Sequence, residues 1–126
     1  MISAFVIHAH RGWGQEHYDL MIQQGQALAT WQVAIPPDRW RAGEPIAAGK
    51  LPDHRIEYLT YEGPVSKGRG SVQRIDRGDC RILQLQEGRW EVEFQGEVVR
   101  GRFEIRRLES GNSPEPWQLA IVSPAQ

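Results

Sequence analysis

The stretch from residue 17 to residue 33 reads HYDLMIQQGQALATWQV. In an extended chain, Tyr18, Leu20 and Ile22 would share one side, and mostly polar residues would share the other. A Gln-Gly pair at 24–25 then supplies a turn before a second run of apolar and β-branched residues. The stretch therefore predicts an antiparallel β-hairpin.

The same alternation recurs along the chain, and 13 Gly and 8 Pro leave few windows for three helical turns. So many short strands must stack as two sheets or close on themselves. We expect a mainly β fold, a small antiparallel barrel of roughly eight strands. Residues 36–53 should form a long loop with one short helical turn. The expected strands lie near residues 3–8, 17–24, 27–34, 56–61, 71–76, 80–86, 89–95, 98–107 and 117–122.

Length and composition narrow the class of protein. A chain of 126 residues and 14.4 kDa predicts a single domain, 1–126. A net charge of -1 argues against coating nucleic acid by bulk charge. The lone Cys80, expected to be a buried thiol, excludes an intramolecular disulfide and indicates a reducing compartment. With no run long enough for a signal peptide or a membrane span, we expect a cytoplasmic protein without a membrane partner. Residues 109–116 read as a poorly ordered linker.

All four histidines lie in the first 54 residues. In a strand, His17 and Asp19 would project to the same side, as would His8 and His10 in the preceding strand. The connecting residues 11–16, RGWGQE, allow the two strands to pair as a hairpin. A divalent ion such as Mn, Fe or Zn accepts two imidazoles and one carboxylate and keeps positions for water or substrate. The pattern indicates a metal site, and a solvated polar strand face is the alternative.

Two further segments carry polar groups. In DHRIEY, residues 53–58, His54 and Tyr58 would share one side of an extended chain and could donate protons or hydrogen bonds to an anionic substrate. The alternative is a loop histidine before an amphipathic strand. The glycine-rich loop 63–70, GPVSKGRG, could offer amides and cations to phosphate, or be an ordinary turn. It lacks the Gly-Lys-Ser/Thr of a Walker loop.

Ordered motifs cover about residues 5–122. They are Phe5-Val6-Ile7 with His10, His17-Tyr18-Asp19, Trp31, Asp53-His54, Tyr58, Tyr61-Glu62-Gly63, Gly68-Arg69-Gly70-Ser71-Val72, Asp76-Arg77-Gly78, Gly96-Glu97 and Arg100-Gly101-Arg102. In this order they resemble the 3'-phosphoesterase domain of bacterial ATP-dependent DNA ligase D. The connection between the first two histidine motifs is one residue longer than in that family.

The resemblance implies a β-barrel enzyme that uses a divalent metal, typically manganese, with zinc or another transition metal as the alternative. Its substrate would be a nucleic acid 3' end, from which it trims phosphate and ribonucleotides. The implied metal ligands are His10, His17 and Asp19, and His54 and Tyr58 would contact the reacting phosphate. We expect a freestanding domain with no fused ligase or polymerase domain, so that other DNA-repair proteins would act in trans.

The chain departs from the family at phosphate-binding positions. Met21 stands where the family has arginine, and Ile35 and Ile46 stand where basic residues are expected. Each lost charge-assisted hydrogen bond contributes about 1.5 to 3 kcal/mol, so substrate binding should weaken. Met21 should project into the site, on the same side of the strand as His17 and Asp19, and the alternative is that it fills an apolar gap in the barrel. The candidate replacement cations are Arg11, Arg55, Lys67 and Arg69.

Three functions remain open from the sequence. The first is a metal-dependent phosphoesterase acting on a nucleic acid 3' end. The second is a non-haem iron enzyme with His17, Asp19 and His54 as ligands. The third is a catalytically weak barrel that binds nucleic acid or a protein partner, which the loss of the family cations favours. The identity of the metal-binding histidines separates the first two.

Overall fold

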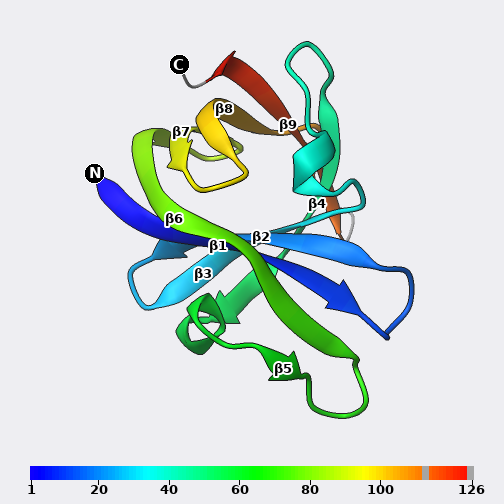
Figure 1. Ribbon diagram of the computed structural model, residues 1–126. Coiled ribbons are helices and arrows are strands. Elements are labelled where there is room, and N and C mark those ends of the chain that lie inside the picture. Colours follow the sequence, from blue (N-terminus) through cyan, green and yellow to red (C-terminus); the bar gives the residue numbers. More distant parts are fainter. Residues whose placement is uncertain (112–113, 125–126) are drawn as a thin grey trace.

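The computed structural model describes residues 1–111 and 114–124 (Figure 1). In these residues it contains strands joined by turns and two single-turn 3₁₀ helices, η1 and η2. The elements are β1 (Ile2–Arg11), β2 (His17–Gln24), β3 (Ala27–Val33), η1 (Pro37–Arg39), β4 (Ile46–Arg55), η2 (Ile56–Leu59), β5 (Gly63–Pro64), β6 (Ser71–Gln86), β7 (Arg89–Gln95), β8 (Arg100–Arg107) and β9 (Glu115–Pro124).

The strands form one antiparallel sheet that closes on itself. The order is β1-β2-β3-β4-β9-β8-β7-β6, and β6 pairs back with β1, so eight strands complete a barrel. The short β5 adds a ninth strand at one end of β6. Among the described strands of the barrel, closure therefore leaves no long unpaired edge for another chain to pair with. The predicted fold class, a small antiparallel barrel with a short helical turn, is confirmed.

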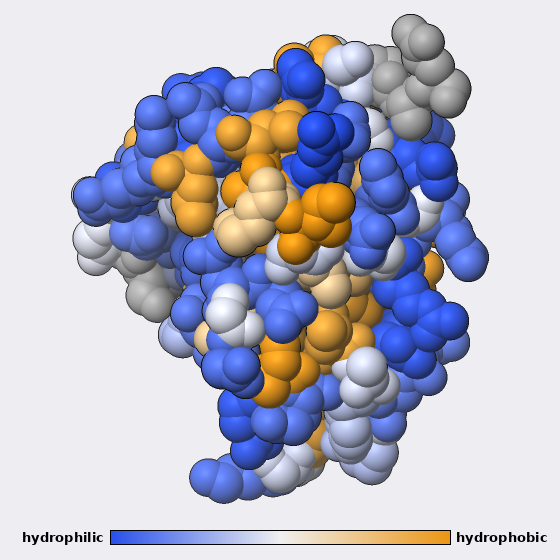
Figure 2. Space-filling view, turned by 90° about the vertical axis from the view of Figure 1, so that its left-hand side faces the viewer, coloured by the Kyte–Doolittle hydropathy of each residue, from blue (hydrophilic) through white to orange (hydrophobic). Residues whose placement is uncertain are grey.

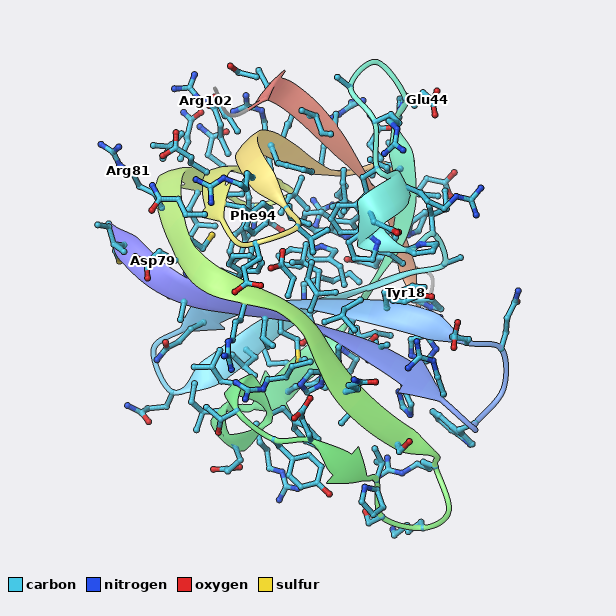
Figure 3. All side chains as sticks on the ribbon, in the orientation of Figure 1. Tyr18, Glu44, Asp79, Arg81, Phe94 and Arg102 are labelled. Atoms are coloured by element: carbon cyan, nitrogen blue, oxygen red, sulfur yellow. The ribbon has the colours of Figure 1, made fainter. Side chains whose placement is uncertain are left out.

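The barrel interior is filled by aromatic side chains. The Trp31 ring lies 5.0 Å from that of Trp90 and 5.6 Å from that of Trp117, measured between centroids. Phe94 packs against Phe5 at 4.7 Å. Figure 3 shows Phe94 inside the barrel and Arg81 pointing away from it. Large aromatic residues that alternate with outward-facing residues on facing strands make a barrel of this size a packed core.

A second apolar cluster lies outside the barrel, on the outer face of the first three strands. Val6, Met21 and Leu28 are fully buried there. The segment that follows β4 crosses this face below the barrel in Figure 1 and covers it with η2. The η2 side chains packed against the cluster are Ile56, Tyr58 and Leu59. The strands β1 and β2 are therefore buried on both faces.

Two predictions of secondary structure in the middle of the chain are wrong. The strand expected at 56–61 is η2, because its apolar side chains pack on one patch, an arrangement that a turn with three residues per turn permits. The long loop expected at 36–53 contains the strand β4, which pairs with both β3 and β9. Hydrogen bonds from two neighbours stabilise β4 although its sequence has no clear alternation.

Other boundaries differ less. The strands expected at 71–76 and 80–86 are one continuous strand, β6. The linker expected at 109–116 includes residues 112 and 113, which lie outside the described residues, and its last two residues begin β9. Cys80 is fully buried, and this burial raises the pKa of its thiol to about 12. It is the buried thiol that was expected.

Figure 2 shows one face of the molecule on which apolar side chains gather in patches among hydrophilic ones. Exposed apolar residues of the described chain include Met1, Ile2 and Leu83. Among the described residues, no helix is both long and apolar enough to cross a membrane.

A buried carboxylate fixes the turn between β7 and β8. Asp76 is 5% exposed and accepts hydrogen bonds from the backbone N–H groups of four residues. They come from Glu97 (2.8 Å), Val98 (3.2 Å), Val99 (2.7 Å) and the neighbouring Arg77 (2.9 Å). A Cβ on Gly96 would lie 2.5 Å from the carboxylate, so only glycine allows this approach.

We predict that Asp76→Ala lowers the free energy of unfolding by about 2 to 4 kcal/mol, because buried backbone donors lose a charged acceptor. Urea unfolding followed by tryptophan fluorescence measures the change. Asp79→Ala, at an exposed position of the same strand, is the control and should change stability by less than about 0.5 kcal/mol. Equal stability of the two variants would contradict the prediction.

Candidate metal and phosphate site

The outer face of β1 and β2 changes from apolar to polar along its length. Their antiparallel register sets Val6 opposite Met21, then His8 opposite Asp19, then His10 opposite His17. The apolar row is covered by η2, whereas the two polar rows face a cavity of about 540 Å³. The described residues that line this cavity are His8, His10, Trp13, His17, Asp19, Gln32, Leu51, Pro52, Asp53, His54, Arg55, Tyr58, Val65, Arg69 and Val72.

Three of these residues form a compact ligand group. His10, His17 and Asp19 each offer one ligand atom, and these atoms lie within 4.8 Å of one another. His10 Nδ1 is 3.7 Å from one carboxylate oxygen of Asp19, and His17 Nε2 is 3.4 Å from the other. The hairpin predicted from the His-x-Asp motif therefore brings the expected three side chains together.

Backbone carbonyls orient both imidazoles of the group. His10 Nε2 donates to the Arg69 carbonyl at 2.7 Å, and His17 Nδ1 donates to the Gln15 carbonyl at 3.2 Å. A carbonyl only accepts, so in a neutral ring the second nitrogen carries the lone pair. In both rings that second nitrogen faces Asp19. Metal-binding histidines are commonly held by such a hydrogen bond through the nitrogen that does not bind the metal.

The carboxylate of Asp19 fits a cation at this position. Asp19 is 3% exposed, and its Oδ1 has no hydrogen-bond partner among the described residues. A buried charge without such partners is costly unless an opposite charge compensates it. Two imidazole nitrogens and one carboxylate oxygen form a donor set suited to manganese, iron or zinc. The residues of the group therefore fit a divalent transition metal.

Protonation of His17 would allow its Nε2 to donate to Asp19. This interaction raises the pKa of His17 above the ordinary value of 6.5, against the opposing effect of burial. The pKa of His8, which lies opposite Asp19 in the strand register, shifts in the other direction. His8 is 1% exposed, and burial lowers its pKa to about 4, although the charge of Asp19 acts in the opposite direction. His8 is therefore neutral at physiological pH, and its buried Nε2 has no hydrogen-bond partner among the described residues.

His54 and Tyr58 line the cavity together with the ligand group. His54 Nδ1 donates to the Pro52 carbonyl at 3.1 Å, and its ring centroid lies 5.9 Å from that of Tyr58. They are not on one side of a strand, as the sequence suggested: His54 is the next-to-last residue of β4, and Tyr58 belongs to η2. Among the described residues, the group at ligand distance contains His10 and not His54, so the ligand set of the non-haem iron hypothesis is not assembled.

A family model of the DNA ligase D 3'-phosphoesterase domain matches residues 7–107. The chain belongs to this family. The match covers every candidate site residue, and it points to a hydrolase. A comparison with curated proteins gave no match.

The four candidate phosphate-binding cations of this 3'-phosphoesterase-family domain fall into two groups, inside and outside the cavity lining. Arg55 and Arg69 line the cavity, as was expected of phosphate contacts. Lys67 lies on the same loop as Arg69 but is exposed and outside the cavity lining, so its contact with phosphate stays a prediction. Arg11 also lies outside the lining, since its side chain bonds to Glu16 and to Gln73.

The expectation that Met21 projects into the site is wrong. Met21 lies on the predicted side of β2, but it is 0% exposed within the outer apolar cluster and does not line the cavity. Ile46 is 2% exposed in the barrel core. At these two positions, the apolar residues of this 3'-phosphoesterase-family domain are structural.

Gln32 and Trp13 are among the cavity residues to which the sequence analysis gave no role. Gln32 lies opposite Asp19 across β2 and β3, and only the strand register reveals that position. Trp13 belongs to the connection between β1 and β2 and is 52% exposed. The signal that could have drawn attention to it is its place in the short connection between two histidine motifs.

We predict that His17→Ala or Asp19→Ala abolishes stoichiometric Mn²⁺ uptake and leaves the circular dichroism spectrum of the folded protein unchanged. Protons compete with metal for neutral imidazole, and Asp19 raises the pKa of His17, so affinity should fall from above pH 6.5 downward. Each displaced proton should weaken the apparent Kd by about tenfold per pH unit. Isothermal titration at pH 8, 7 and 6 measures this. A flat profile, or full uptake by both variants, would place the metal elsewhere.

We predict that Met21→Arg lowers the free energy of unfolding by about 3 to 5 kcal/mol, because a guanidinium would be buried without a partner. Met21→Leu keeps the volume and should cost less than about 1.5 kcal/mol. Chemical denaturation of both variants tests the difference. A stable arginine variant with tighter phosphate binding would show instead that this side chain reaches the cavity.

Proposed function

We propose that the protein is a metal-dependent phosphoesterase that removes a 3'-phosphate or a 3'-ribonucleotide from DNA ends. One observation carries the proposal: a ligand group for a divalent metal shares one cavity with His54, Tyr58 and two arginines. This combination suits a phosphoester, which needs charge neutralisation, oriented hydrogen-bond donors and proton transfer. Membership of the 3'-phosphoesterase family supports the same reaction class.

In this proposal His10, His17 and Asp19 hold the metal, manganese in the first instance. When bound, such a cation supplies Lewis-acid polarisation of a phosphoryl oxygen and lowers the pKa of a water molecule. Asp19 contributes the negative charge of the group. The carbonyls of Arg69 and Gln15 keep the two rings turned toward it.

His54 is proposed to move the proton. Its Nδ1–H is held by the Pro52 carbonyl, so its Nε2 is the nitrogen free to hold or transfer a proton at an oxygen of the substrate. The Tyr58 hydroxyl would donate a hydrogen bond to a phosphoryl oxygen. Arg55, whose guanidinium lies 5.9 Å from the Tyr58 ring centroid, and Arg69 would neutralise its charge. Lys67 would contact the nucleic acid strand where it extends beyond the cavity.

The cellular setting follows from the substrate. A protein that trims 3' ends in DNA repair would act in the cytoplasm, beside its nucleic acid. The products it leaves are ends for a polymerase or ligase, and those repair proteins would be supplied in trans.

A second candidate is a barrel that binds nucleic acid ends with little or no turnover. One observation favours it: Met21 and Ile46, at positions where the family has cations, are buried in apolar clusters. These two positions therefore supply no cation to the cavity. Labelled DNA with a 3'-phosphate or a 3'-ribonucleotide, incubated with and without Mn²⁺, separates the two candidates. Release of phosphate or ribonucleotide that depends on Mn²⁺ supports the enzyme, and binding without release supports the second candidate.

We predict that His54→Ala lowers turnover of the 3'-phosphate substrate by about 10² to 10⁴ while stoichiometric Mn²⁺ uptake is retained. Tyr58→Phe should weaken turnover through loss of one donor. Tyr61→Phe is its control, because the Tyr61 hydroxyl bonds to the Pro64 carbonyl and does not line the cavity. Loss of metal from the His54 variant would overturn the assigned role of His54.

A further inference from the structure

The connection between β1 and β2 carries an exposed tryptophan at the rim of the cavity. Trp13 is 52% exposed, and its ring stacks on that of His10 with centroids 5.9 Å apart and planes inclined by 29°. The indole therefore contacts His10 and keeps about half of its surface exposed. A partly exposed aromatic ring thus lines the cavity beside the metal-ligand group.

The backbone holds this indole in place. Trp13 stands between Gly12 and Gly14, whose φ angles of 84° and 68° favour glycine. The connection also touches the loop before β6: a Cβ on Gly70 would lie 2.0 Å from the Arg11 carbonyl oxygen. Only glycine permits this backbone contact. The main chain thus places Trp13 beside the loop that precedes β6, and the contact with His10 orients its ring.

Side chains close the base of the same connection. Arg11 and Glu16 form an ion pair across it, and the Tyr18 hydroxyl donates to Glu16 at 3.0 Å. An aromatic platform that is already ordered loses little conformational freedom when a ligand stacks on it. Base–aromatic stacking is tolerant of sequence, since every nucleobase has a π face.

We propose that Trp13 is a stacking platform for the base of the 3'-terminal nucleotide, whose phosphate lies in the cavity. This inference rests on the proposed function and deepens it. It assigns the site to nucleic acid ends, in which a planar base follows the reacting phosphate by one sugar, and not to small aliphatic phosphoesters. The platform would bind any of the bases by stacking and would not discriminate between them.

The test compares two fluorescein-labelled oligonucleotides that end in a 3'-phosphate. One has a terminal thymidine, and the other has an abasic tetrahydrofuran at that position. Binding is measured by fluorescence anisotropy with Mn²⁺ in the His54→Ala background, which slows hydrolysis during the titration. The variants are Trp13→Ala, Trp13→Phe and the control Leu108→Ala, which trims a side chain 49% exposed and outside the cavity lining.

Trp13→Ala should weaken binding of the thymidine end by about 5- to 100-fold and of the abasic end by less than about twofold. Trp13→Phe should retain most of the affinity, and Leu108→Ala should retain all of it. An equal effect of Trp13→Ala on both ends, or no effect on either, would overturn the inference while the proposed function stands.

Mn²⁺ titration of the same variants separates stacking on a base from support of His10. Unchanged metal affinity of Trp13→Ala agrees with a platform, whereas a parallel loss of metal would show that Trp13 positions His10, and it would overturn the inference. If the parent protein binds neither oligonucleotide, the proposed function fails, and the inference fails with it.

Discussion

The antiparallel register of β1 and β2 is the constraint on which the site depends. It sets His8 opposite Asp19 and His10 opposite His17 on the outer face, while the alternate residues of both strands fill the barrel. Because side chains alternate with a period of two, a slip of one residue would turn the imidazoles into the core and the apolar residues outward. The stability of the barrel and the geometry of the ligand group are therefore maintained by the same pairing.

The outer face also explains where the cavity lies. Its apolar end, at Val6, Met21 and Leu28, needs a cover, and η2 provides it. The segment that makes this contact also carries Tyr58 and follows directly after His54. Hydrophobic packing beside the site thus brings two polar side chains to the ligand group, although they are 35 or more residues distant from it in sequence.

Main-chain groups set the details of the site. The carbonyls of Gln15 and Arg69 orient the two imidazoles, and the contact at Gly70 holds the loop of Arg69 against the connection that carries Trp13. These contacts come from the turns that flank the strands of the site. The family match covers both turns, and the first of them carries the exposed indole.

The sequence by itself determined the hairpin of β2 and β3, the barrel class and the shared side of His17 and Asp19, because a period of two is a local property of the chain. It could not determine β4, which depends on pairing with β3 and β9, or η2, whose apolar residues alternate briefly but pack on one patch. Met21 shows the same division: alternation assigns its side of the strand, but only the tertiary structure decides that η2 covers it. Contacts between segments distant in sequence decide which side chains are buried, and such contacts cannot be predicted from a local sequence pattern.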